Sequence, residues 1–235
     1  YAHAKGVLAT EGTTGFWLSH SMPNRPNQPT GEYASGSAGI FPSDKYAQSM
    51  GCVTISASTA NEIADTLRVD YPAVYIGSIP PDIADQVDHM TELINKVKIS
   101  STNITAANAF YTMDGQKYIQ FAKSKKWAMD LWDDLIAPYY KTPMNVETWI
   151  SGSGGAMSSM CYNATNPAIE KINEPYDIFQ VAYIEMPDGE NWANTQDHSK
   201  WGVATNSEPD NNQKFNSLAS CIGDINRMCS QENRG

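Results

Sequence analysis

Two copies of the tripeptide His-x-Lys stand near the two ends of this sequence. The first is His3-Ala4-Lys5 and the second is His198-Ser199-Lys200. Residues i and i+2 of a β-strand point to the same face, so each tripeptide can place an imidazole beside an ammonium group. Two such pairs in one chain indicate two half-sites that meet at one substrate.

This pairing of side chains suits the chemistry of a phosphodiester. A lysine supplies a point charge to phosphate oxygens, one histidine can attack phosphorus, and the other can protonate the leaving oxygen. A single His-x-Lys occurs often by chance, but these two copies contain two of only 4 histidines. From the tripeptides alone, the alternative stays open that both are solvated surface segments.

Longer stretches around the tripeptides form a further pattern. They are His3-Ala-Lys-Gly-Val-Leu8, Gly15-Phe-Trp-Leu-Ser-His20-Ser21, Asp197-His-Ser-Lys-Trp201, Cys221-Ile-Gly-Asp-Ile-Asn226-Arg227 and Gln231-Glu-Asn-Arg-Gly235. Together, and in this order over essentially the whole chain, they resemble the deoxyribonuclease II family of the phospholipase D superfamily. The resemblance implies an α/β fold of two similar halves that form a pseudo-dimer with the active site between them. The expected halves are residues 1–110 and 111–235.

The resemblance also implies a reaction. The family consists of acid, metal-independent endonucleases, so DNA is the expected substrate and neither a metal nor another cofactor is expected. His3 and His198 are the expected catalytic pair, and Lys5 and Lys200 are expected to bind the scissile phosphate. One histidine forms a phosphohistidine, the other protonates the departing 5′-oxygen, and water then releases a 3′-phosphate. Which histidine is the nucleophile stays open, with a preference for His3.

An acidic residue follows His-x-Lys by a few positions in the wider superfamily, where it orients the imidazole. In the first half of this chain the candidate is Glu11, where relatives carry an aspartate. The same offset from His198 falls on Asn206, so the resemblance supplies no carboxylate there, and Glu208 is only a guess for a substitute.

Three more residues are expected to support the site. The segment Gly223-Asp224-Ile225-Asn226 resembles the superfamily's Gly-Ser-x-Asn motif, which assigns a phosphate contact to Asn226 and, less directly, to Asp224. His20 takes the comparable place in the first half, although a structural role for His20 stays equally open. His89 lies in a polar helical pattern and is expected at the surface.

The charge of the chain fits a nucleic-acid enzyme only in acid. The formal net charge is −10 and the pI is about 4.8, whereas DNA binding usually relies on lysine and arginine. Near roughly pH 4 to 5, many carboxylates take up protons and histidines become cationic, which eases the conflict. A surface kept acidic for solubility is the other reading.

Cysteines and sequons favour a secretory route. The chain contains Cys52, Cys161, Cys221 and Cys229, with sequons at Asn103 and Asn163, and it lacks the HExxH, CxxC and paired-histidine spacings of zinc sites. We therefore expect a secreted or lysosomal glycoprotein with disulfides and no membrane partner, since no run of 18 apolar residues occurs. The resemblance implies that the partners of Cys52 and Cys161 lie in segments or a chain beyond this sequence. Cys221 and Cys229 pair only if local geometry permits, and a homodimer is a further option.

Hydrophobic patterning predicts an α/β protein. The predicted hairpin covers 3–20, and a long irregular segment at 21–48 is expected to shape a substrate groove. A helix over 59–69 is predicted to begin at Thr59 in a capping box with Glu62 and to stop before Pro72. The other expected elements are strands at 52–56, 97–105, 117–123, 144–150, 178–185 and 198–205, and helices at 82–95, 124–136 and 166–173.

Two functions from different classes compete. The first is an acid, metal-independent endodeoxyribonuclease, supported by two intact His-x-Lys pairs. The second is a secreted, catalytically weak relative that binds nucleic acid or a partner protein, supported by the acidic charge and the altered acid at Glu11. Transfer of phosphatidyl groups on lipids is a distant third, because nothing in the sequence marks a lipid-binding surface.

Overall fold

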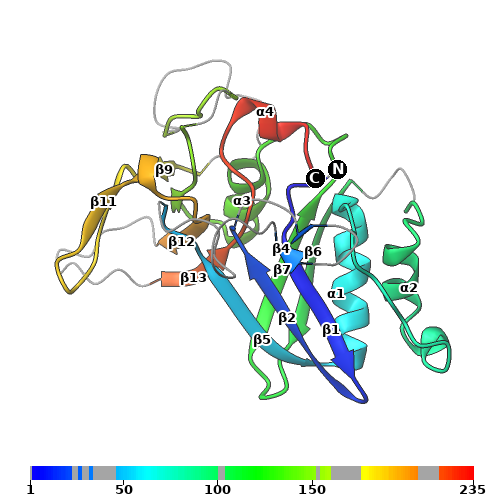
Figure 1. Ribbon diagram of the computed structural model, residues 1–235. Helices are drawn as coiled ribbons and strands as arrows, with labels where there is room; N and C mark the ends of the chain where they lie inside the picture. The colour runs from blue at the N-terminus through cyan, green and yellow to red at the C-terminus, as the bar shows by residue number, and fades with distance from the viewer. Residues whose placement is uncertain are drawn as a thin grey trace. The chain divides into compact units, whose positions relative to one another are not determined.

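A computed structural model of the chain divides into two compact units with a mixed α/β architecture (Figure 1). The structure describes residues 2–22, 46–99, 104–151, 154–159, 176–205 and 217–235, and the backbone alone at 26–27 and 32–33. Unit one contains residues 1–45, 50–128 and 233–235, and unit two contains 46–49 and 129–232. Within the described residues, no helix is both long enough and apolar enough to cross a bilayer.

The first sheet of unit one begins with the predicted hairpin. Strand β1 (Gly6–Glu11) pairs antiparallel with β2 (Thr14–His20), and β2 pairs antiparallel with β5 (Met50–Ser56), in the order β1-β2-β5. Gly12 forms the hairpin turn with φ of 59°, a conformation that favours glycine. The sequence therefore predicted this hairpin and the strand at 52–56 correctly, whereas the His-x-Lys residues precede β1 rather than belonging to it.

Helix α1 (Ala57–Asp70) follows β5 directly. The predicted capping box is wrong, because Ser56 is the N-cap and its Oγ accepts a hydrogen bond from the Thr59 amide at 3.0 Å. Tyr71 ends the helix in a left-handed conformation with φ of 56°, one residue before Pro72. The sequence thus located the helix and its end, but placed its start three residues too late, since Ser56 and Thr59 are both able to cap.

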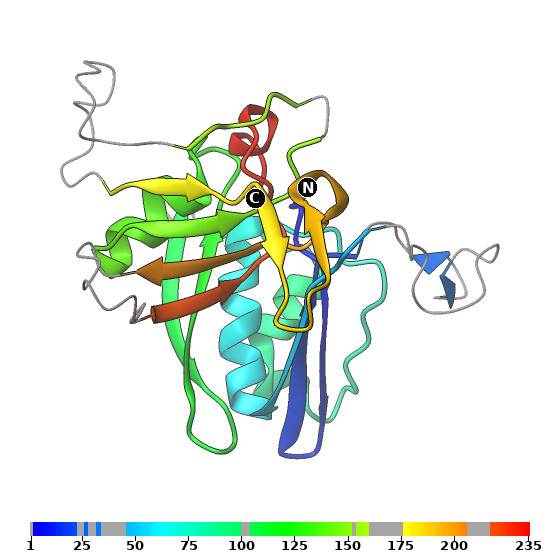
Figure 2. The same cartoon turned by 90° about the vertical axis from the view of Figure 1, so that its left-hand side faces the viewer.

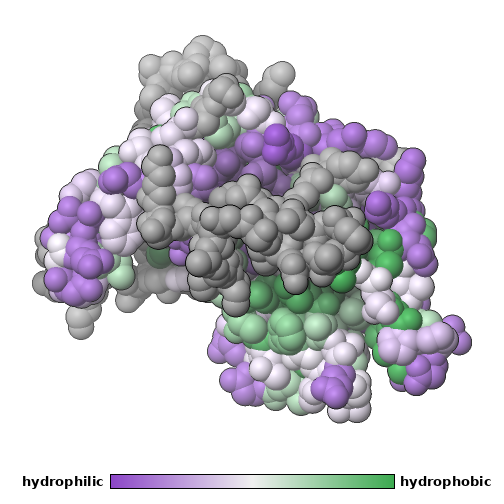
Figure 3. All heavy atoms as spheres, viewed as in Figure 1, coloured by the Kyte–Doolittle hydropathy of each residue, from purple (hydrophilic) through white to green (hydrophobic). Residues whose placement is uncertain are grey.

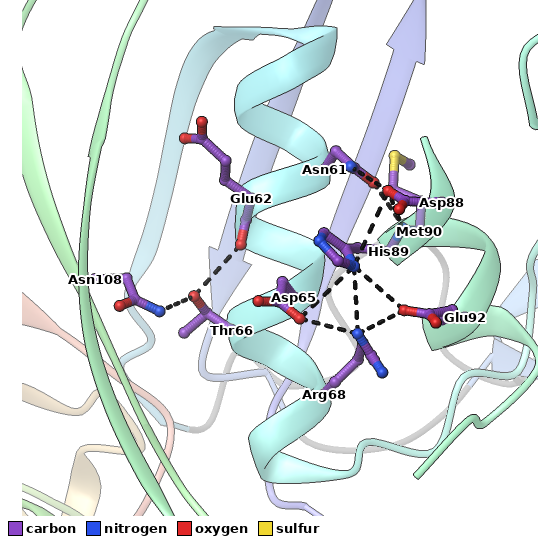
Figure 4. Close-up of polar contacts among 10 residues, drawn as sticks. All are labelled: Asn61, Glu62, Asp65, Thr66, Arg68, Asp88, His89, Met90, Glu92 and Asn108. Atoms are coloured by element: carbon purple, nitrogen blue, oxygen red, sulfur yellow. Dashed lines mark hydrogen bonds and ion pairs between the residues drawn. The ribbon is translucent and has the colours of Figure 1, made fainter. Parts of the chain in front are cut away.

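A short helix, α2 (Asp88–Ile94), packs beside α1 through a polar cluster (Figure 4). Arg68 of α1 forms ion pairs with Asp65 at 2.9 Å and with Glu92 of α2 at 2.6 Å. His89 lies 3.2 Å from Glu92 and is partly exposed, close to its predicted surface position. Only a 3₁₀ turn at 84–86 precedes α2, so the observed helix has about half the length of the helix predicted over 82–95.

A second hairpin completes unit one. Strands β6 (Thr105–Tyr111) and β7 (Lys117–Lys123) pair antiparallel, and α1 contacts both this hairpin and the first sheet. Asn108 of β6 donates a hydrogen bond to Thr66 of α1 at 2.9 Å (Figure 4). The core is apolar and comes from all of these elements, with Ile55, Ala60, Ile63, Leu67 and Phe110 buried at its centre.

The other face of the first sheet carries apolar side chains at the surface. Figure 3 shows hydrophobic residues gathered over β1, β2 and β5. Val7 is 45% exposed, Phe16 is 38% exposed and Met50 is 46% exposed. The alternation of a strand explains this arrangement, because Leu8, Trp17 and Val53 point inward to the core and their neighbours must point outward.

The main sheet of unit two has the order β13-β12-β8-β9 (Figure 2). Its strands are β8 (Met144–Glu147), β9 (Ile178–Gln180), β12 (Trp201–Thr205) and β13 (Ser217–Ile222). Strand β12 is antiparallel to both of its neighbours, whereas β8 and β9 run parallel. Trp132, which is 1% exposed, packs against this sheet at Gly202.

Several predicted elements of unit two are wrong in extent. Of the predicted helix at 124–136, residues 124–130 are not helical, whereas 131–136 are, with a π-helical turn (Trp132–Ile136) that leads into α3 (Ala137–Tyr140). Pro138 lies within the first turn of α3, where its missing N–H costs nothing, so it does not end a helix as predicted. The predicted strand at 178–185 is split into β9 and β10 (Tyr183–Glu185), and β10 pairs with β11 (Asn191–Ala193).

The remaining described elements are short. They are α4 (Cys229–Glu232) and the strand pair β3 (Pro26–Asn27) and β4 (Glu32–Tyr33). Of the predicted strand at 97–105, residues 97–99 are not β-structure and only Thr105 enters β6. Asn103, Asn163, Cys161 and the predicted helix at 166–173 lie outside the described residues, as does most of 21–48.

The cysteines that the structure describes are free thiols. Cys52 and Cys229 are exposed, and Cys221 is partly buried. Burial raises the pKa of the Cys221 thiol to about 11. The conditional pairing of Cys221 with Cys229 is therefore not formed in this structure.

Candidate functional site

The first His-x-Lys tripeptide is folded back on itself in unit one. The Nζ atom of Lys5 lies 3.0 Å from Nδ1 of His3 and donates a hydrogen bond to the His3 carbonyl oxygen at 2.8 Å. The backbone amide of His3 donates to the Gly235 carbonyl at 2.8 Å. Both contacts hold the Lys5 ammonium group against the histidine two residues earlier.

The second tripeptide repeats this arrangement in unit two. The Nζ atom of Lys200 donates a hydrogen bond to the His198 carbonyl oxygen, and Lys200 is only 2% exposed. Strand β12 begins at Trp201, directly after the tripeptide, as β1 begins at Gly6 directly after the first one. In both units the lysine therefore contacts the histidine two residues earlier, although neither tripeptide belongs to a strand.

The segment that faces each tripeptide is also equivalent. Gly6 pairs with Ser19, and the next residue, His20, donates its amide hydrogen to the Lys5 carbonyl at 3.2 Å. Trp201 pairs with Ile222, and the next residue, Gly223, donates its amide hydrogen to the Lys200 carbonyl at 2.8 Å. His20-Ser21 and Gly223-Asp224 therefore occupy the same register position in the two units, as the sequence comparison of these segments predicted.

Both tripeptides are followed by a glycine against which a tryptophan packs. A Cβ atom at Gly6 would lie 2.5 Å from the Trp17 ring, and one at Gly202 would lie 2.6 Å from the Trp132 ring. Such distances are shorter than van der Waals contact, so only glycine fits at each position. The glycine directly follows the tripeptide in unit one but follows Trp201 in unit two, so the units share a tripeptide that leads into a strand and differ in the position of this glycine.

The expected supporting residues differ in where they lie. His20, the last residue of β2 in unit one, is 4% exposed. Asn226 is 8% exposed and Asp224 is half-buried, and both lie just beyond the end of β13 in unit two. Glu11 is exposed at the turn end of β1, roughly 20 Å along the strand from Lys5 at ~3.3 Å per residue. The structure therefore does not bring Glu11 to His3.

A buried carboxylate directly precedes the second tripeptide. Asp197 is 2% exposed, and its oxygens accept hydrogen bonds from the Ser199 amide at 2.7 Å and from Nε1 of Trp192 at 2.9 Å. These two bonds fix the backbone on both sides of His198. Asn206, the position where an acid was sought, lies outside the described residues.

A second buried carboxylate, Glu147, lies on the strand beside the tripeptide. Glu147 of β8 pairs with Trp201 of β12 and is 0% exposed. Within the described part of the chain, neither of its carboxylate oxygens has a hydrogen-bond partner. Burial, and then the nearby charge of Asp197, raise the pKa of Glu147 to about 8, and Lys200 opposes this rise only in part. Glu147 is therefore protonated at neutral and acidic pH.

Two aromatic rings enclose the side chain of His198. The ring of Tyr46 is stacked on the imidazole, with centroids 4.6 Å apart and an interplanar angle of 24°. The ring of Trp149 lies with its centroid 3.9 Å from that of the imidazole, at 52°. Tyr46 and Trp149 also meet edge to face at 4.9 Å, so the three rings form one cluster.

Sequence reasoning missed Tyr46, Trp149, Glu147 and Asp197. Asp197 could have been found, because it adjoins His198 in the sequence. Glu147 could have been found as a charged residue within a predicted strand of unit two. Nothing local indicates Tyr46, since its position beside His198 depends on backbone pairing between segments far apart in the chain. Among the residues that the structure describes, no group of three or more His, Cys, Asp or Glu side chains is placed to hold a metal ion.

Comparisons with known proteins point to one family. A family model described as deoxyribonuclease II matches residues 1–235. Plancitoxin-1 from Acanthaster planci is 30% identical over 235 residues, which are 99% of this chain and 58% of that protein. Cell-death-related nuclease 7 from Caenorhabditis elegans is 31% identical over 99% of this chain and 57% of its own length.

A mammalian relative gives the same result. Deoxyribonuclease-2-beta from Rattus norvegicus is 30% identical over 231 residues, which are 98% of this chain and 58% of that protein. The chain thus spans somewhat more than half the length of the relatives that it matches.

Proposed function

Because the chain belongs to the deoxyribonuclease II family, we propose that it forms part of an endodeoxyribonuclease that cleaves DNA in acid without a metal ion. The observation that carries this proposal is the repeated His-x-Lys construction, in which Lys5 and Lys200 each contact the histidine two residues earlier. The relatives named as nucleases match nearly the whole chain, which gives further support.

The two units, in this proposal, carry the two half-sites of one active centre. The shared register of the segments that face Lys5 and Lys200 supports two similar halves, as in a phospholipase D-like pseudo-dimer. The boundary near residue 110 between these halves stays a prediction. Both lysines would then neutralise the oxygens of a single phosphate, which replaces the charge that a metal ion supplies in other nucleases.

The reaction proceeds in two displacements. An unprotonated ring nitrogen of His3 attacks phosphorus, the bond from phosphorus to the 5′-oxygen breaks, and the imidazolium of His198 gives that oxygen a proton. His198 then takes a proton from water, whose oxygen displaces His3 and leaves a 3′-phosphate. The sequence-based preference for His3 as the nucleophile is kept, and Lys5, whose Nζ atom lies 3.0 Å from Nδ1 of His3, places a positive charge beside the attacking ring.

The supporting residues extend the same scheme. We assign phosphate contacts to Asn226 and His20, and a weaker contribution to Asp224, on the strength of their places beside the tripeptides. Glu11 is not assigned the task of orienting the imidazole in the first half, because β1 carries it away from His3. In the second half Asp197 fixes the backbone around His198 and takes over that orienting task.

The proposed cellular location rests on the same resemblance to the family. We propose a secreted or lysosomal protein, glycosylated at Asn103 and Asn163, whose partner is DNA. The acidic pH of a lysosome would protonate the general acid and reduce the negative charge of the protein.

Trapping of the covalent intermediate tests the mechanism. A DNA oligonucleotide labelled near its 5′ end is incubated at pH 5 with EDTA and quenched in alkali, since phosphohistidine survives base better than acid. The account predicts label on the wild type and none on His3→Asn. On His198→Asn the label should form slowly and then persist, because this variant lacks the group that both promotes formation of the adduct and releases it. Product ends should resist extension by a polymerase until a phosphatase removes the 3′-phosphate. Label on a residue outside the two tripeptides would refute the scheme.

The binding-protein alternative retains two supporting observations, the net charge of −10 and the exposed position of Glu11. It predicts retardation of a DNA duplex on a native gel, or capture of a protein partner, with the duplex left intact at pH 5. Cleavage by the wild type that is lost in His198→Ala excludes it.

A further inference from the structure

We propose that Tyr46 and Trp149 are positioning residues that hold the His198 ring in one orientation and stabilise its protonated form. The inference deepens the proposed function and rests on it, because it explains how one of the two histidines is prepared to act as the acid. It is carried by the three-ring cluster, in which the imidazole lies 4.6 Å from Tyr46 and 3.9 Å from Trp149.

The backbone holds the Tyr46 ring against His198. Ala47 forms a parallel bridge with Asp197, in which the Ala47 amide donates to the Gln196 carbonyl at 3.0 Å and the His198 amide donates to the Ala47 carbonyl at 2.8 Å. Two hydrogen bonds therefore flank the residue that follows Tyr46. Movement of His198 away from Tyr46 would break this pairing, so the stacked geometry is built into the main chain.

A different element holds Trp149. It follows Thr148, which is 0% exposed and whose Oγ1 accepts a hydrogen bond from the Arg227 amide at 3.0 Å. Arg227 in turn adjoins Asn226, the predicted phosphate ligand of the same unit. Two independently anchored rings thus confine the imidazole, and a ring held on two sides loses little rotational freedom when a substrate binds.

The electrostatic effect of the two aromatic rings favours the protonated form of His198. The faces of tyrosine and tryptophan carry partial negative charge and attract a cation within about 6 Å of their centroids. Both centroid distances to His198 fall inside this range. An imidazolium therefore gains more from this enclosure than a neutral imidazole does, and the acid in the proposed reaction must be an imidazolium.

The charged groups around His198 do not replace this effect. Lys200 donates a hydrogen bond to the His198 carbonyl, and its positive charge disfavours a protonated His198 ring. The buried Asp197 carboxylate favours a protonated ring, but its oxygens are hydrogen-bonded to Ser199 and Trp192. Glu147 faces Asp197 and Lys200 from β8 and is neutral over the acidic range because of its raised pKa. The two aromatic rings contact the imidazole directly.

Titration of the ring by NMR tests the proposal without any need for catalysis. The protein contains 4 histidines, so ring-labelled histidine gives few signals, and His198→Ala identifies the one in question. We expect Tyr46→Leu and Trp149→Leu to lower the titration midpoint of His198 by about 0.5 pH or more, which corresponds to the usual strength of such contacts. Tyr46→Phe keeps the ring face and should retain the wild-type midpoint.

A matched control and a kinetic readout separate positioning from folding. Tyr183→Leu removes an aromatic ring that is 56% exposed on β10 and should leave every histidine midpoint unchanged. In the nuclease assay the two leucine variants should lose kcat with little change in KM, whereas Tyr46→Phe should retain both. If no protein cleaves DNA, the proposed function fails and the titration still decides this inference.

An unchanged or raised His198 midpoint in Tyr46→Leu overturns the proposal. If Trp149→Leu fails to fold, as judged by the midpoints of the other three histidines, the comparison of Tyr46→Leu with Tyr46→Phe decides. Equal midpoints in those two variants mean that the rings only pack.

Discussion

Glu147 shows how one buried side chain links stability to pH. Burial and Asp197 raise the pKa of its carboxyl group from 4.5 in the unfolded chain to about 8 in the folded protein. Below the lower of these two values both folded and unfolded chains hold the proton, so the group does not make the free energy of unfolding vary with pH. Between the two values only the folded state holds it, so stability falls as the pH rises through this window.

We therefore predict that Glu147→Gln becomes more stable relative to the wild type as the pH rises. The glutamine imitates the protonated group at every pH, so the difference in Tm between the two proteins should be small at pH 5 and clearly favour the variant at pH 8. Differential scanning fluorimetry across this range measures it. Asp134, whose pKa is raised to about 6, is present in both proteins, so its effect on Tm cancels in the difference between them.

Glu185→Gln is the matched control, since this glutamate of β10 is exposed. It should give the same change in Tm relative to the wild type at both pH values. Parallel stability curves for Glu147→Gln and the wild type would contradict the account of Glu147.

Arg227 connects several elements of unit two and supports the segment that carries Asn226. It is 0% exposed, and its Nε atom lies 3.7 Å from Asp130, which precedes the π-helical turn. Its amide bonds to Thr148 after β8, and its Nη1 atom donates to the Ser158 carbonyl at 3.3 Å. These contacts fix the residue next to Asn226 from three directions.

Removal of this guanidinium should destabilise the protein strongly. Arg227→Met leaves Asp130 buried without its cation, which typically costs about 3–5 kcal/mol. Denaturant unfolding measures the change in the free energy of unfolding. Arg234→Met, at an exposed arginine, should change this free energy little, and Arg227→Met with Asp130→Asn should recover part of the loss. Equal unfolding midpoints for Arg227→Met and the wild type would contradict the assigned role.

Local signals predicted some elements and failed at others. The 3–20 hairpin, helix α1 and strand β7 follow from alternation, helical spacing and turn glycines, all of which are short-range. Of the helix predicted at 124–136 only residues 131–136 are helical, because Asp130 accepts hydrogen bonds from the amides of Trp132 and Asp133 and the helix starts there. That choice depends on the buried partner Arg227, which lies about a hundred residues away in the sequence and gives no local signal.

Some residues of the candidate site could likewise be predicted from local sequence, and others could not. The two tripeptides and the Gly223–Asn226 segment were identified from sequence because they are contiguous motifs. The enclosure of His198 by Tyr46 and the burial of Glu147 beside Lys200 depend on sheet pairing, which a single sequence does not reveal. Conversely, Glu11 has the right spacing, but a straight strand carries it away from His3.

The protein as a whole is acidic, which determines how its affinity for DNA must vary. With a net charge of −10 near neutrality, repulsion opposes binding, and protonation of histidines and carboxylates weakens that repulsion. We predict that a variant with alanine at both His3 and His198 binds a short duplex more tightly at pH 5 than at pH 7. Fluorescence anisotropy at constant ionic strength measures this, and equal or weaker binding at pH 5 would contradict the prediction.

Cleavage of a supercoiled plasmid at pH 5 in EDTA tests the central claim, that two His-x-Lys half-sites cut DNA without a metal ion. The comparison includes wild type, His3→Ala, His198→Ala and the control His89→Ala, which alters a histidine in the α1–α2 polar cluster. The account predicts nicking and linearisation by the wild type and the control. In each tripeptide variant the cleavage rate should fall at least about a hundredfold, as expected when a catalytic acid or base is missing. Cleavage that persists in His198→Ala, or its absence in a folded wild type, would contradict it.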